Sequence, residues 1–240
     1  METIVITGAA GGIGIETVKK LARADRHILC VDVSEAQLGR LESVISGLPG
    51  QFTLVASRLE RADECRSVLK PVFGQVHSLA HLAGLFEPDP DAINDMGVYE
   101  RAISSNLTNA YLMGHAAFEA RDDSSIMTQV YISSSAFRRG APDHGPYGIA
   151  KAGLVGLARS LGRRFAPHAR VNVLAPGIID TQMPAEVIRQ RGLEKIATEV
   201  PLGRVGKPHE VAAAIAFLLG EESSFINCQT INVDGGMIAS

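Results

Sequence analysis

Tyr147 and Lys151 are the two residues of this sequence whose types and spacing best suit chemistry. If they share a helix, a separation of four residues places them on one face, where an ammonium group favours the ionised form of the phenol. A phenol whose pKa is about 10 is a poor acid or base at neutral pH, and lowering that pKa lets it exchange a proton with a hydroxyl or carbonyl group. Together with Ser134, thirteen residues upstream of the tyrosine, the pair suggests proton transfer on an alcohol or ketone. The alternative is two side chains on a helix surface that reach only into water.

The amino-terminal segment supports the chemical hypothesis because it has the order strand, glycine turn, helix. Residues 3–6 are an apolar, β-branched run, residues 7–14 contain four glycines, and residues 15–22 are typical of a helix. Glycines permit a tight turn and let backbone N–H groups approach a pyrophosphate at the positive end of the helix. A flexible loop is the alternative, but this order favours a dinucleotide-binding site.

Asp32 indicates which dinucleotide is bound. It ends the strand-like run 27–32, about 20 residues past the glycines, where a carboxylate accepts hydrogen bonds from a ribose 2′-hydroxyl and repels a 2′-phosphate. This position favours NAD(H) over NADP(H). Asp32 or Ser34 can instead cap the helix that begins near Glu35, but Ser34 with Gln37 already fits a capping box and leaves Asp32 free.

Several motifs in this order make the chain resemble the classical short-chain dehydrogenase/reductase (SDR) family over essentially its whole length. Residues 7–14 resemble the family's TGxxxGxG cofactor loop, and residues 81–84 occupy the place of its NNAG segment. Residues 147–151 match its YxxxK motif. Residues 176–181 resemble the stretch that holds the nicotinamide end of the cofactor, and residues 233–236 are typical of its tail.

The resemblance implies a catalytic set of four residues. Tyr147 is the acid in reduction and the base in oxidation, while Lys151 lowers the tyrosine pKa and hydrogen-bonds the nicotinamide ribose. Ser134 holds the substrate oxygen, and Asn106 supports a water through which the lysine communicates with solvent. A structural interpretation stands beside each role, because Ser134 is one of three serines at a strand end and Asn106 can cap or kink its helix.

The same resemblance implies a set of residues that bind the dinucleotide. They are Thr7, Gly8, Gly12, Ile13, Gly14, Asp32, Arg58, Leu59, Ala83, Gly84, Tyr147, Lys151, Pro176, Gly177, Ile179 and Thr181.

The chain departs from the family pattern at two places. His81 and Leu82 stand where the family commonly has two asparagines, so side-chain hydrogen bonds that steady the central strand must be replaced or lost, and cofactor affinity is open to change. Arg58 stands in a segment where an acidic residue often faces the adenine. It can stack on the adenine, lie in solvent or attract a 2′-phosphate, which keeps NADP(H) open as the alternative cofactor.

The pattern along the chain predicts an α/β fold. Strands are expected near residues 3–7, 27–32, 52–56, 77–82, 126–133, 170–175 and 229–233, with helices between most of them. This alternation predicts a Rossmann-type, doubly wound parallel sheet covered by helices on both faces, with ligands at the carboxyl ends of the strands. Residues 1–240 are expected to form a single dinucleotide-binding and catalytic domain, with Asn106 in a helical stretch over residues 99–120.

Composition excludes several classes of protein. The net charge of −3 with scattered basic residues gives no stripe for nucleic acid. No signal peptide is apparent, and no apolar run reaches the about 18 residues that a membrane helix needs, so we expect a cytoplasmic protein without membrane contact. Three cysteines without metal or redox spacing suit a reducing compartment. His77 and His81 are four apart, but they lie in a strand-like segment, and no metal is expected.

The substrate is defined less well by the sequence. Residues 182–200 have an amphipathic pattern suited to a flap over the nicotinamide, and Phe86 and Phe137 can add apolar walls, so we expect a partly apolar secondary alcohol or ketone. Arg138, Arg139 and His144 have two interpretations. They form a solvated loop, or they recognise an anionic group, which would indicate a 3-oxoacyl thioester reductase of the acyl-carrier-protein type.

Two further hypotheses concern the class and assembly of the protein. A non-catalytic NAD(H)-binding scaffold or regulator is the alternative class, because a fold alone does not define a function. The resemblance implies a homo-oligomer, a tetramer or dimer, assembled through the helices that carry Asn106 and Tyr147 and through the segment 236–240.

Overall fold

Seven parallel strands form one sheet in the computed structural model, which describes residues 1–89, 94 and 96–238. Their order across the sheet is β3-β2-β1-β4-β5-β6-β7, with the crossover between β1 and β4 that a doubly wound sheet requires. The strands are β1 (Glu2–Thr7), β2 (Arg26–Asp32), β3 (Gln51–Ala56), β4 (Val76–His81), β5 (Met127–Ile132), β6 (Ala169–Pro176) and β7 (Thr230–Val233). The predicted fold class is confirmed, and the predicted strand positions agree to within two residues at each end.

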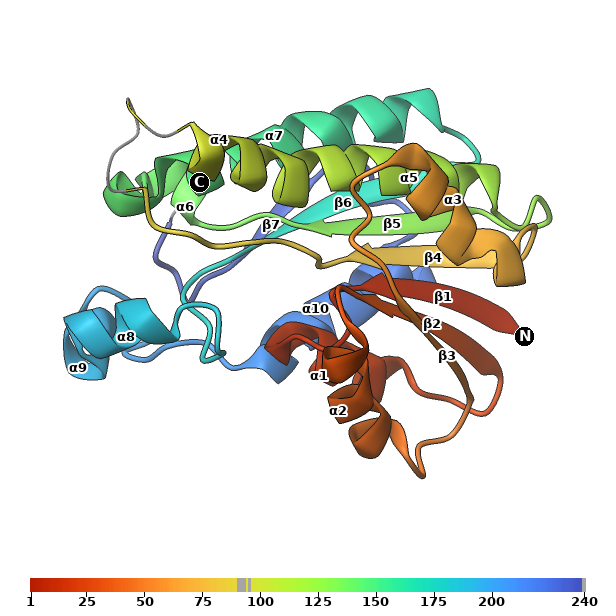
Figure 1. Cartoon of the computed structure of the whole chain (residues 1–240), viewed down its shortest axis with the longest axis horizontal. Helices are drawn as coiled ribbons and strands as arrows, with labels where there is room; N and C mark the ends of the chain where they lie inside the picture. Colours follow the sequence, from red (N-terminus) through yellow and green to blue (C-terminus); the bar gives the residue numbers. More distant parts are fainter. Residues whose placement is uncertain (90–93, 95, 239–240) are drawn as a thin grey trace.

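Helices cover both faces of this sheet (Figure 1). The α-helices are α1 (Gly12–Leu21), α2 (Glu35–Ile45), α3 (Ala62–Leu69), α4 (Gly97–Ile103), α5 (Asn109–Glu119), α6 (Ala136–Arg139), α7 (Gly145–Arg164), α8 (Ala185–Arg191), α9 (Leu193–Thr198) and α10 (Pro208–Leu219). Helices α1, α2 and α10 pack on one face, and α3, α5 and α7 pack on the other. Among the described residues, none of the helices has the length and apolar character needed to span a bilayer.

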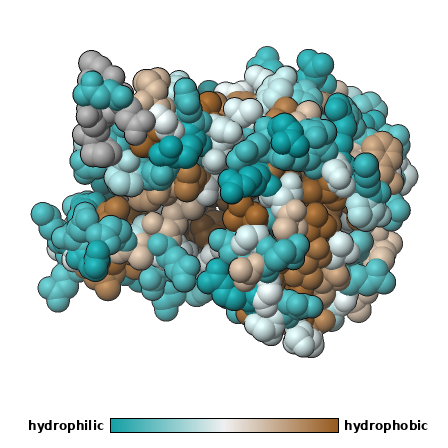
Figure 2. Space-filling model, viewed as in Figure 1, coloured by the Kyte–Doolittle hydropathy of each residue, from teal (hydrophilic) through white to brown (hydrophobic). Residues whose placement is uncertain are grey.

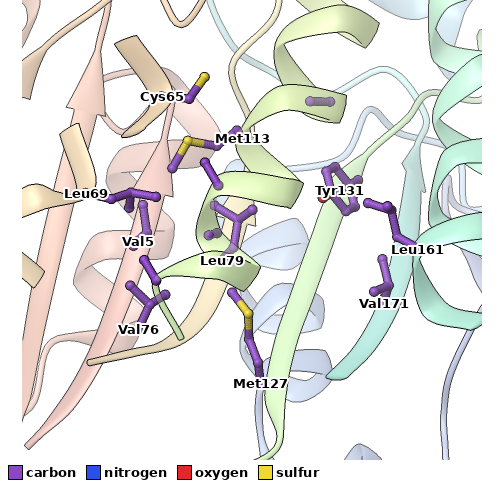
Figure 3. Packing of buried hydrophobic residues seen from close by; sticks show 14 of the residues in the cluster. Val5, Cys65, Leu69, Val76, Leu79, Met113, Met127, Tyr131, Leu161 and Val171 are labelled. Atoms are coloured by element: carbon purple, nitrogen blue, oxygen red, sulfur yellow. The ribbon is translucent and has the colours of Figure 1, made fainter. Parts of the chain in front are cut away.

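Alternation along the strands divides the core into two layers. In β1, Ile4 and Ile6 pack with the α1 and α10 layer, whereas Val5 between them packs with the α5 and α7 layer. Figure 3 shows the second layer, in which Met113 of α5 lies among side chains that project from the strands. Because both faces are covered, the strands bury apolar side chains on both sides of the sheet.

The helical stretch predicted for residues 99–120 is interrupted in the structure. Helix α4 ends at Ile103, a π-helical turn spans Ser104–Thr108, and α5 begins at Asn109. The predicted helical stretch is confirmed up to residue 119, and the π-helical turn within it is a feature that the sequence pattern did not indicate. Such turns are frequent at functional sites.

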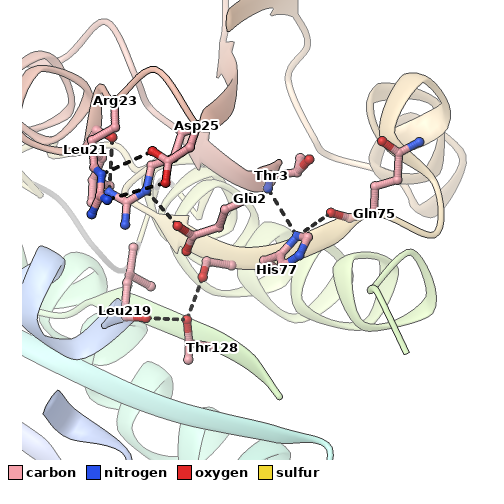
Figure 4. Close-up of polar contacts among 11 residues, drawn as sticks. Glu2, Thr3, Leu21, Arg23, Asp25, Gln75, His77, Thr128 and Leu219 are labelled. Carbon is pink, nitrogen blue, oxygen red and sulfur yellow. Dashed lines mark hydrogen bonds and ion pairs between the residues drawn. The ribbon is translucent and has the colours of Figure 1, made fainter. Parts of the chain in front are cut away.

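Polar contacts join residues at the amino ends of the strands (Figure 4). Arg26 donates to the Glu2 carboxylate at 2.7 Å, and the Thr3 N–H donates to Nδ1 of His77 at 3.1 Å. The Thr128 hydroxyl at the start of β5 donates to the Leu219 carbonyl at 3.3 Å. The residues that suggest chemistry lie at the opposite, carboxyl ends of the strands.

Candidate active site

The glycine-rich turn between β1 and α1 has positions that only glycine fits. Gly8 has a φ of +67°, and a Cβ there would lie 2.8 Å from the backbone nitrogen of Ala83. A Cβ on Gly14 would lie 2.2 Å from the Gly8 carbonyl oxygen. A Cβ on Gly12 would lie 2.7 Å from Cγ2 of Thr181, so the two predicted ends of the cofactor site are adjacent. The turn leads directly into the N-terminus of α1, as a pyrophosphate site requires.

Thr7 joins this turn to the segment after β4. Its hydroxyl accepts a hydrogen bond from the Ala83 N–H at 3.3 Å, and its carbonyl accepts one from the Leu82 N–H at 3.1 Å. The Thr7 hydroxyl also lies 2.9 Å from Nδ1 of His81. At the position where the family commonly has an asparagine, His81 therefore supplies the polar side-chain contact to Thr7.

Asp32 lies beside the glycine turn at the end of β2. Its carboxylate accepts hydrogen bonds from the Ala10 N–H at 2.8 Å and from the Val33 N–H at 2.7 Å. Ser34, not Asp32, caps α2, because its hydroxyl accepts from the Gln37 N–H. This arrangement agrees with the sequence prediction and leaves Asp32 at the position where an adenosine ribose would lie.

Arg58 and Leu59 differ in what they can offer a cofactor. The Arg58 side chain is 70% exposed and lies 3.7 Å from the Glu60 carboxylate. Leu59 has a φ of +58°, and its side chain is buried in the core that α3 and α5 cover. Only the backbone of Leu59 can therefore face a cofactor, which the sequence did not indicate.

The nicotinamide end predicted from residues 176–181 lies against the last strand. The Gly177 N–H donates to the Val233 carbonyl at 3.0 Å, and a Cβ on Gly177 would lie 3.0 Å from Asp234. Pro176 ends β6, Ile179 is 5% exposed, and Thr181 is half-buried next to Gly12. These contacts bring the predicted carboxyl-terminal part of the site to the same edge as the glycine turn.

Tyr147, Lys151 and Ser134 converge at this edge of the sheet. Tyr147 lies in the first turn of α7 and Lys151 one turn later on the same face, with the lysine Nζ 5.5 Å from the centre of the tyrosine ring. Nζ donates to the Ile132 carbonyl at 2.9 Å. Ser134 follows β5, accepts from the Ala136 N–H at 3.1 Å, and has its hydroxyl near enough to that of Tyr147 to lower the tyrosine pKa. The sequence prediction that the pair shares one helix face is confirmed.

Burial, rather than charge, dominates the acidity of this pair. It raises the pKa of Tyr147 to about 12, and the nearby Ser134 hydroxyl acts against this shift. Burial also lowers the pKa of Lys151 to about 8. The net shift of the tyrosine pKa is opposite to the one predicted from the spacing of the pair, because both groups leave water and the lysine Nζ donates to a backbone carbonyl rather than to the phenol.

Asn106 is held by its π-helical turn against the loop after β4. Its side-chain amide donates to the carbonyls of Leu85 at 2.9 Å and Ala102 at 3.0 Å, and its oxygen accepts from the Leu85 N–H at 3.2 Å. A Cβ on Gly84 would lie 2.4 Å from the Asn106 oxygen and 3.1 Å from Nζ of Lys151. Asn106, Lys151 and the Gly84 backbone therefore meet at one point.

An aromatic cluster lies beside Tyr147, and the sequence predicted only part of it. Phe86 stacks on His144 with ring centres 4.0 Å apart and packs edge-on against Tyr147 at 4.8 Å. Burial lowers the pKa of His144, so the neutral ring, not an imidazolium, lines this wall at neutral pH. Phe86 is predicted from the sequence as a wall, but its pairing with His144 is not, because the two are far apart in the chain and only the tertiary structure brings them together.

Residues 182–200, which we call the cover segment, project from the sheet as α8 and α9 (Figure 1). Arg191 within the segment and Arg139 outside it both pair with Glu199. Figure 2 shows a hollow with apolar walls between this projection and the part that carries α4 and α6. A pocket behind the segment is lined by Ile179, Val200 and ten other residues, and none of the four catalytic candidates is among them.

Comparison with known proteins gives a consistent result over the whole chain. A family described as enoyl-(acyl carrier protein) reductase matches residues 8–238. A 3-oxoacyl-(acyl-carrier-protein) reductase of Thermotoga maritima is 30% identical over 98% of this chain and 96% of its own length. A tropinone reductase homolog of Arabidopsis thaliana is 32% identical over 98% of this chain and 78% of its own length.

Solved structures show the same likeness in three dimensions. A short-chain dehydrogenase/reductase described as glucose/ribitol dehydrogenase from Brucella melitensis superposes with a TM-score of 0.91 and 30% identity, covering 100% of this chain and 97% of its own. A short-chain type dehydrogenase/reductase from Mycobacterium ulcerans superposes with a TM-score of 0.91 and 26% identity, covering 98% and 89%.

Proposed function

This chain belongs to the short-chain dehydrogenase/reductase family and is an NAD(P)-dependent oxidoreductase, and we propose that it interconverts a secondary alcohol and a ketone with Tyr147 as the proton-transfer group. The observation that carries the proposal is the convergence of three side chains. Nζ of Lys151 lies 5.5 Å from the Tyr147 ring centre, and the Ser134 hydroxyl lies near that of the tyrosine and lowers its pKa. A proton donor, a second hydroxyl and a cation thus share one edge of the sheet.

Each residue has a role in this proposal. In reduction, Tyr147 donates its hydroxyl proton to the substrate oxygen, and in oxidation the phenolate takes that proton back. Ser134 donates to the same oxygen and stabilises the charge that develops on it. Lys151 binds the nicotinamide ribose and favours the phenolate when the substrate alcohol is oxidised. Asn106 holds the loop against which the lysine packs, through its three bonds to Leu85 and Ala102.

The raised tyrosine pKa supports reduction as the faster direction near neutral pH. Reduction needs the protonated phenol, and a pKa of about 12 keeps Tyr147 in that form. Oxidation needs the phenolate, whose fraction grows as pH rises toward that value. We therefore expect ketone reduction to dominate at neutral pH and alcohol oxidation to accelerate in alkaline solution.

The residues of the glycine turn fit a dinucleotide, and we propose NAD(H) as the preferred one. A glycine at each of positions 8, 12 and 14 keeps the approach to the α1 N-terminus free of side chains. When bound, the dinucleotide supplies or accepts the hydride. Asp32 accepts from two backbone N–H groups and keeps oxygen lone pairs for a ribose hydroxyl, and its charge repels a 2′-phosphate. The Arg58 side chain is exposed, and because its charge can attract a 2′-phosphate, NADP(H) remains the alternative cofactor.

The walls around Tyr147 favour a partly apolar ketone. Phe86 and the neutral His144 offer a flat, uncharged surface against the tyrosine. A second candidate is a 3-oxoacyl thioester, which the name of the Thermotoga maritima relative supports. For that substrate, Arg138 offers an exposed cation beside the Phe137 ring, in the segment between Ser134 and Tyr147.

Replacing Tyr147 with phenylalanine tests the proposed function. Tyr147→Phe removes the proton donor and keeps the ring, so reduction of ethyl acetoacetate should fall by about a hundredfold or more. NADH binding, followed by the fluorescence of the reduced nicotinamide, should stay within about threefold because the ring still fills its site. The exposed tyrosine of α5, changed as Tyr111→Phe, is the matched control and should keep the wild-type rate.

Two further arms of the same assay test the cofactor and the substrate. Comparison of NADH with NADPH should show preference for NADH, and Asp32→Ser should narrow that preference because it removes the repulsive charge. Activity confined to the N-acetylcysteamine thioester of acetoacetate, with none on ethyl acetoacetate or acetophenone, would establish the thioester alternative. Binding of NADH without oxidation by any of these ketones would instead support a non-catalytic scaffold, and wild-type turnover by Tyr147→Phe would exclude the tyrosine mechanism.

Three broader predictions accompany this function. We propose residues 1–240 as one domain, because all seven strands of the described chain join one sheet. We propose a homo-oligomer, a tetramer or dimer, in which exposed apolar side chains such as Ile149, Phe217 and Phe225 are covered. Ala239 and Ser240, at the end of the segment predicted to assist assembly, lie outside the described residues. We also propose a cytoplasmic location.

A further inference from the structure

His81 occupies the centre of the sheet at the edge where the active site lies. It is the last residue of β4 and is paired in register with Thr7 of β1 on one side and Tyr131 of β5 on the other. The imidazole is 1% exposed, and its centre lies 5.8 Å from that of the Tyr131 ring. A titratable side chain at this depth must find partners or stay neutral, and none of the proposed catalytic roles uses it.

The contacts of Thr7 suit one of the two neutral tautomers of the imidazole. The Thr7 hydroxyl accepts from the Ala83 N–H, and it lies 2.9 Å from Nδ1 of His81. In the tautomer with an unprotonated Nδ1, the hydroxyl donates its own proton to that nitrogen. Since burial lowers the pKa of His81 to about 3, the ring is neutral, and in this tautomer its one N–H group is on Nε2.

Nε2 of His81 lies near the side chain of Asn109, the first residue of α5, which acts on the ring as a hydrogen-bonding group. Nε2 of His81 and Oδ1 of Asn109 are both buried, and neither has a hydrogen-bond partner among the described residues. With the proton on Nε2, the two atoms are a donor and an acceptor that a small movement would join, and each left unsatisfied costs about 1–3 kcal/mol.

The other half of the Asn109 side chain supports the π-helical turn. The Asn109 backbone N–H donates to the Ser104 carbonyl, five residues earlier, and not to the Ser105 carbonyl, its acceptor in a regular α-helix. The Nδ2 group of Asn109 donates to the Ser105 carbonyl at 2.7 Å instead. One side chain therefore compensates the irregular turn that places Asn106 against Leu85.

We propose that His81 and Asn109 are a positioning pair for the proton-transfer site, linking Thr7 of the cofactor turn to the π-helical turn that holds Asn106. This inference rests on the proposed function, because the position of Asn106 affects turnover only if Asn106 and Lys151 take part in the reaction. The link runs from Thr7 through the imidazole and the Asn109 amide to the turn, and from Asn106 to Gly84 and the lysine Nζ. Neither His81 nor Asn109 touches substrate in this proposal.

The test combines three variants with a matched control. His81→Phe and Asn109→Leu each break the link by replacing a polar side chain with an apolar one of similar size. The third variant combines both substitutions. Asn172→Leu is the control, because Asn172 on β6 is also a buried amide with two backbone bonds, to the Ile226 carbonyl at 2.8 Å and the Gln229 N–H at 3.0 Å. Turnover of ethyl acetoacetate per folded molecule, NADH affinity and melting temperature are measured for each.

We expect each single variant to lower kcat by about tenfold or more, because a small displacement of positioned groups reduces turnover strongly. NADH affinity should change by less than about threefold, and the double variant should be no slower than the slower single variant, since both interrupt one link. Asn172→Leu should lose stability and keep its kcat. Unchanged kcat in both single variants, or losses that multiply in the double variant, would overturn the proposal.

A measurement on the unmodified protein covers the case in which the variants do not fold. The ¹⁵N shifts of the His81 ring should show a protonated Nε2 and an unprotonated Nδ1, whereas a proton on Nδ1 would overturn the pairing with Asn109. Tyr147→Phe in the same assay distinguishes failure of the proposed function from failure of the positioning pair. If it retained wild-type turnover, the proposed function would fail, whereas a slow Tyr147→Phe beside fully active His81→Phe and Asn109→Leu would reject only the positioning pair.

Discussion

The two sides of the active-site hollow are built in different ways. The side formed by Gly84, Asn106, Tyr147 and Lys151, which we call the floor, is held by short hydrogen bonds to backbone groups. The cover segment opposite it is attached through ion pairs of half-exposed side chains, with Glu199 between Arg139 and Arg191. Buried, bonded groups keep fixed positions, whereas exposed ion pairs contribute little and are screened by salt.

This difference separates two tasks of an oxidoreductase. Proton and hydride transfer need reacting groups held to within a fraction of an ångström, which suits the floor. Substrate entry and choice need a boundary that can move or vary, which suits the cover segment. Ile196 and Val200 are the buried apolar residues that anchor this segment, while most of the segment's other side chains are exposed.

The strongest test of a rigid floor is a methyl group placed at its centre. In Gly84→Ala the new Cβ would lie 2.4 Å from the Asn106 oxygen, and the surrounding bonds leave little room to yield. We expect a loss of about 1–3 kcal/mol in the free energy of unfolding, measured by urea titration, together with a fall in turnover of at least about tenfold.

Gly156→Ala is the control for that experiment. Gly156 lies on the exposed side of α7, and a Cβ there would meet nothing within 4 Å. Alanine should stabilise the helix by about 0.4–1 kcal/mol and leave turnover unchanged. Normal turnover in Gly84→Ala would show that the floor adapts as readily as the cover segment.

Acid should destabilise the floor through His81. Its pKa is about 3 in the folded protein and about 6.5 when unfolded, so between these values the unfolded chain binds the additional proton. Stability from this group is complete above pH 6.5 and falls as pH drops toward 3, by about 2 kcal/mol at pH 5. Urea titrations of wild type and His81→Asn at pH 7 and pH 5 should show a smaller acid loss in the variant.

His168→Asn is the matched comparison for the acid experiment, because His168 is exposed. It should reproduce the wild-type loss of stability between pH 7 and pH 5. If His81→Asn lost as much stability as wild type on acidification, the buried imidazole would not contribute to the acid sensitivity of the floor.

The smallest effect is expected in the cover segment. Glu199→Gln removes the carboxylate that Arg191 and Arg139 share, but all three side chains are partly exposed. We expect the KM for ethyl acetoacetate to change by about threefold at most, with kcat and melting temperature unchanged. In 0.5 M NaCl, wild type should approach the variant, since salt screens the pair. A large fall in kcat would place the cover segment in the catalytic machinery.

The sequence predicted the sheet well because strand patterns depend on local composition. All seven strand positions agree with the structure, and Tyr147 and Lys151 share one helix face as their spacing requires. The capping of α2 by Ser34, which leaves Asp32 beside the glycine turn, also follows from short-range rules. The roles of the four catalytic candidates remain predictions.

Three features of the site were not predicted, and each depends on neighbours distant in the chain. The π-helical turn at Asn106 interrupts a stretch whose pattern indicates a continuous helix. The contact of Phe86 with His144 joins two separate loops. The pKa of Tyr147 is raised by burial, although its spacing from Lys151 suggests that it is lowered.

The amino-acid sequence by itself determined the order of strands and helices, the glycine turn and the side chains available for proton transfer, because these follow from local periodicity and residue type. The tertiary structure alone decided how deeply those side chains are buried, which backbone groups they bond, and that His81 lies near Asn109. Burial and hydrogen bonding arise when segments distant in sequence pack together, and they set the acidity and position on which chemistry depends.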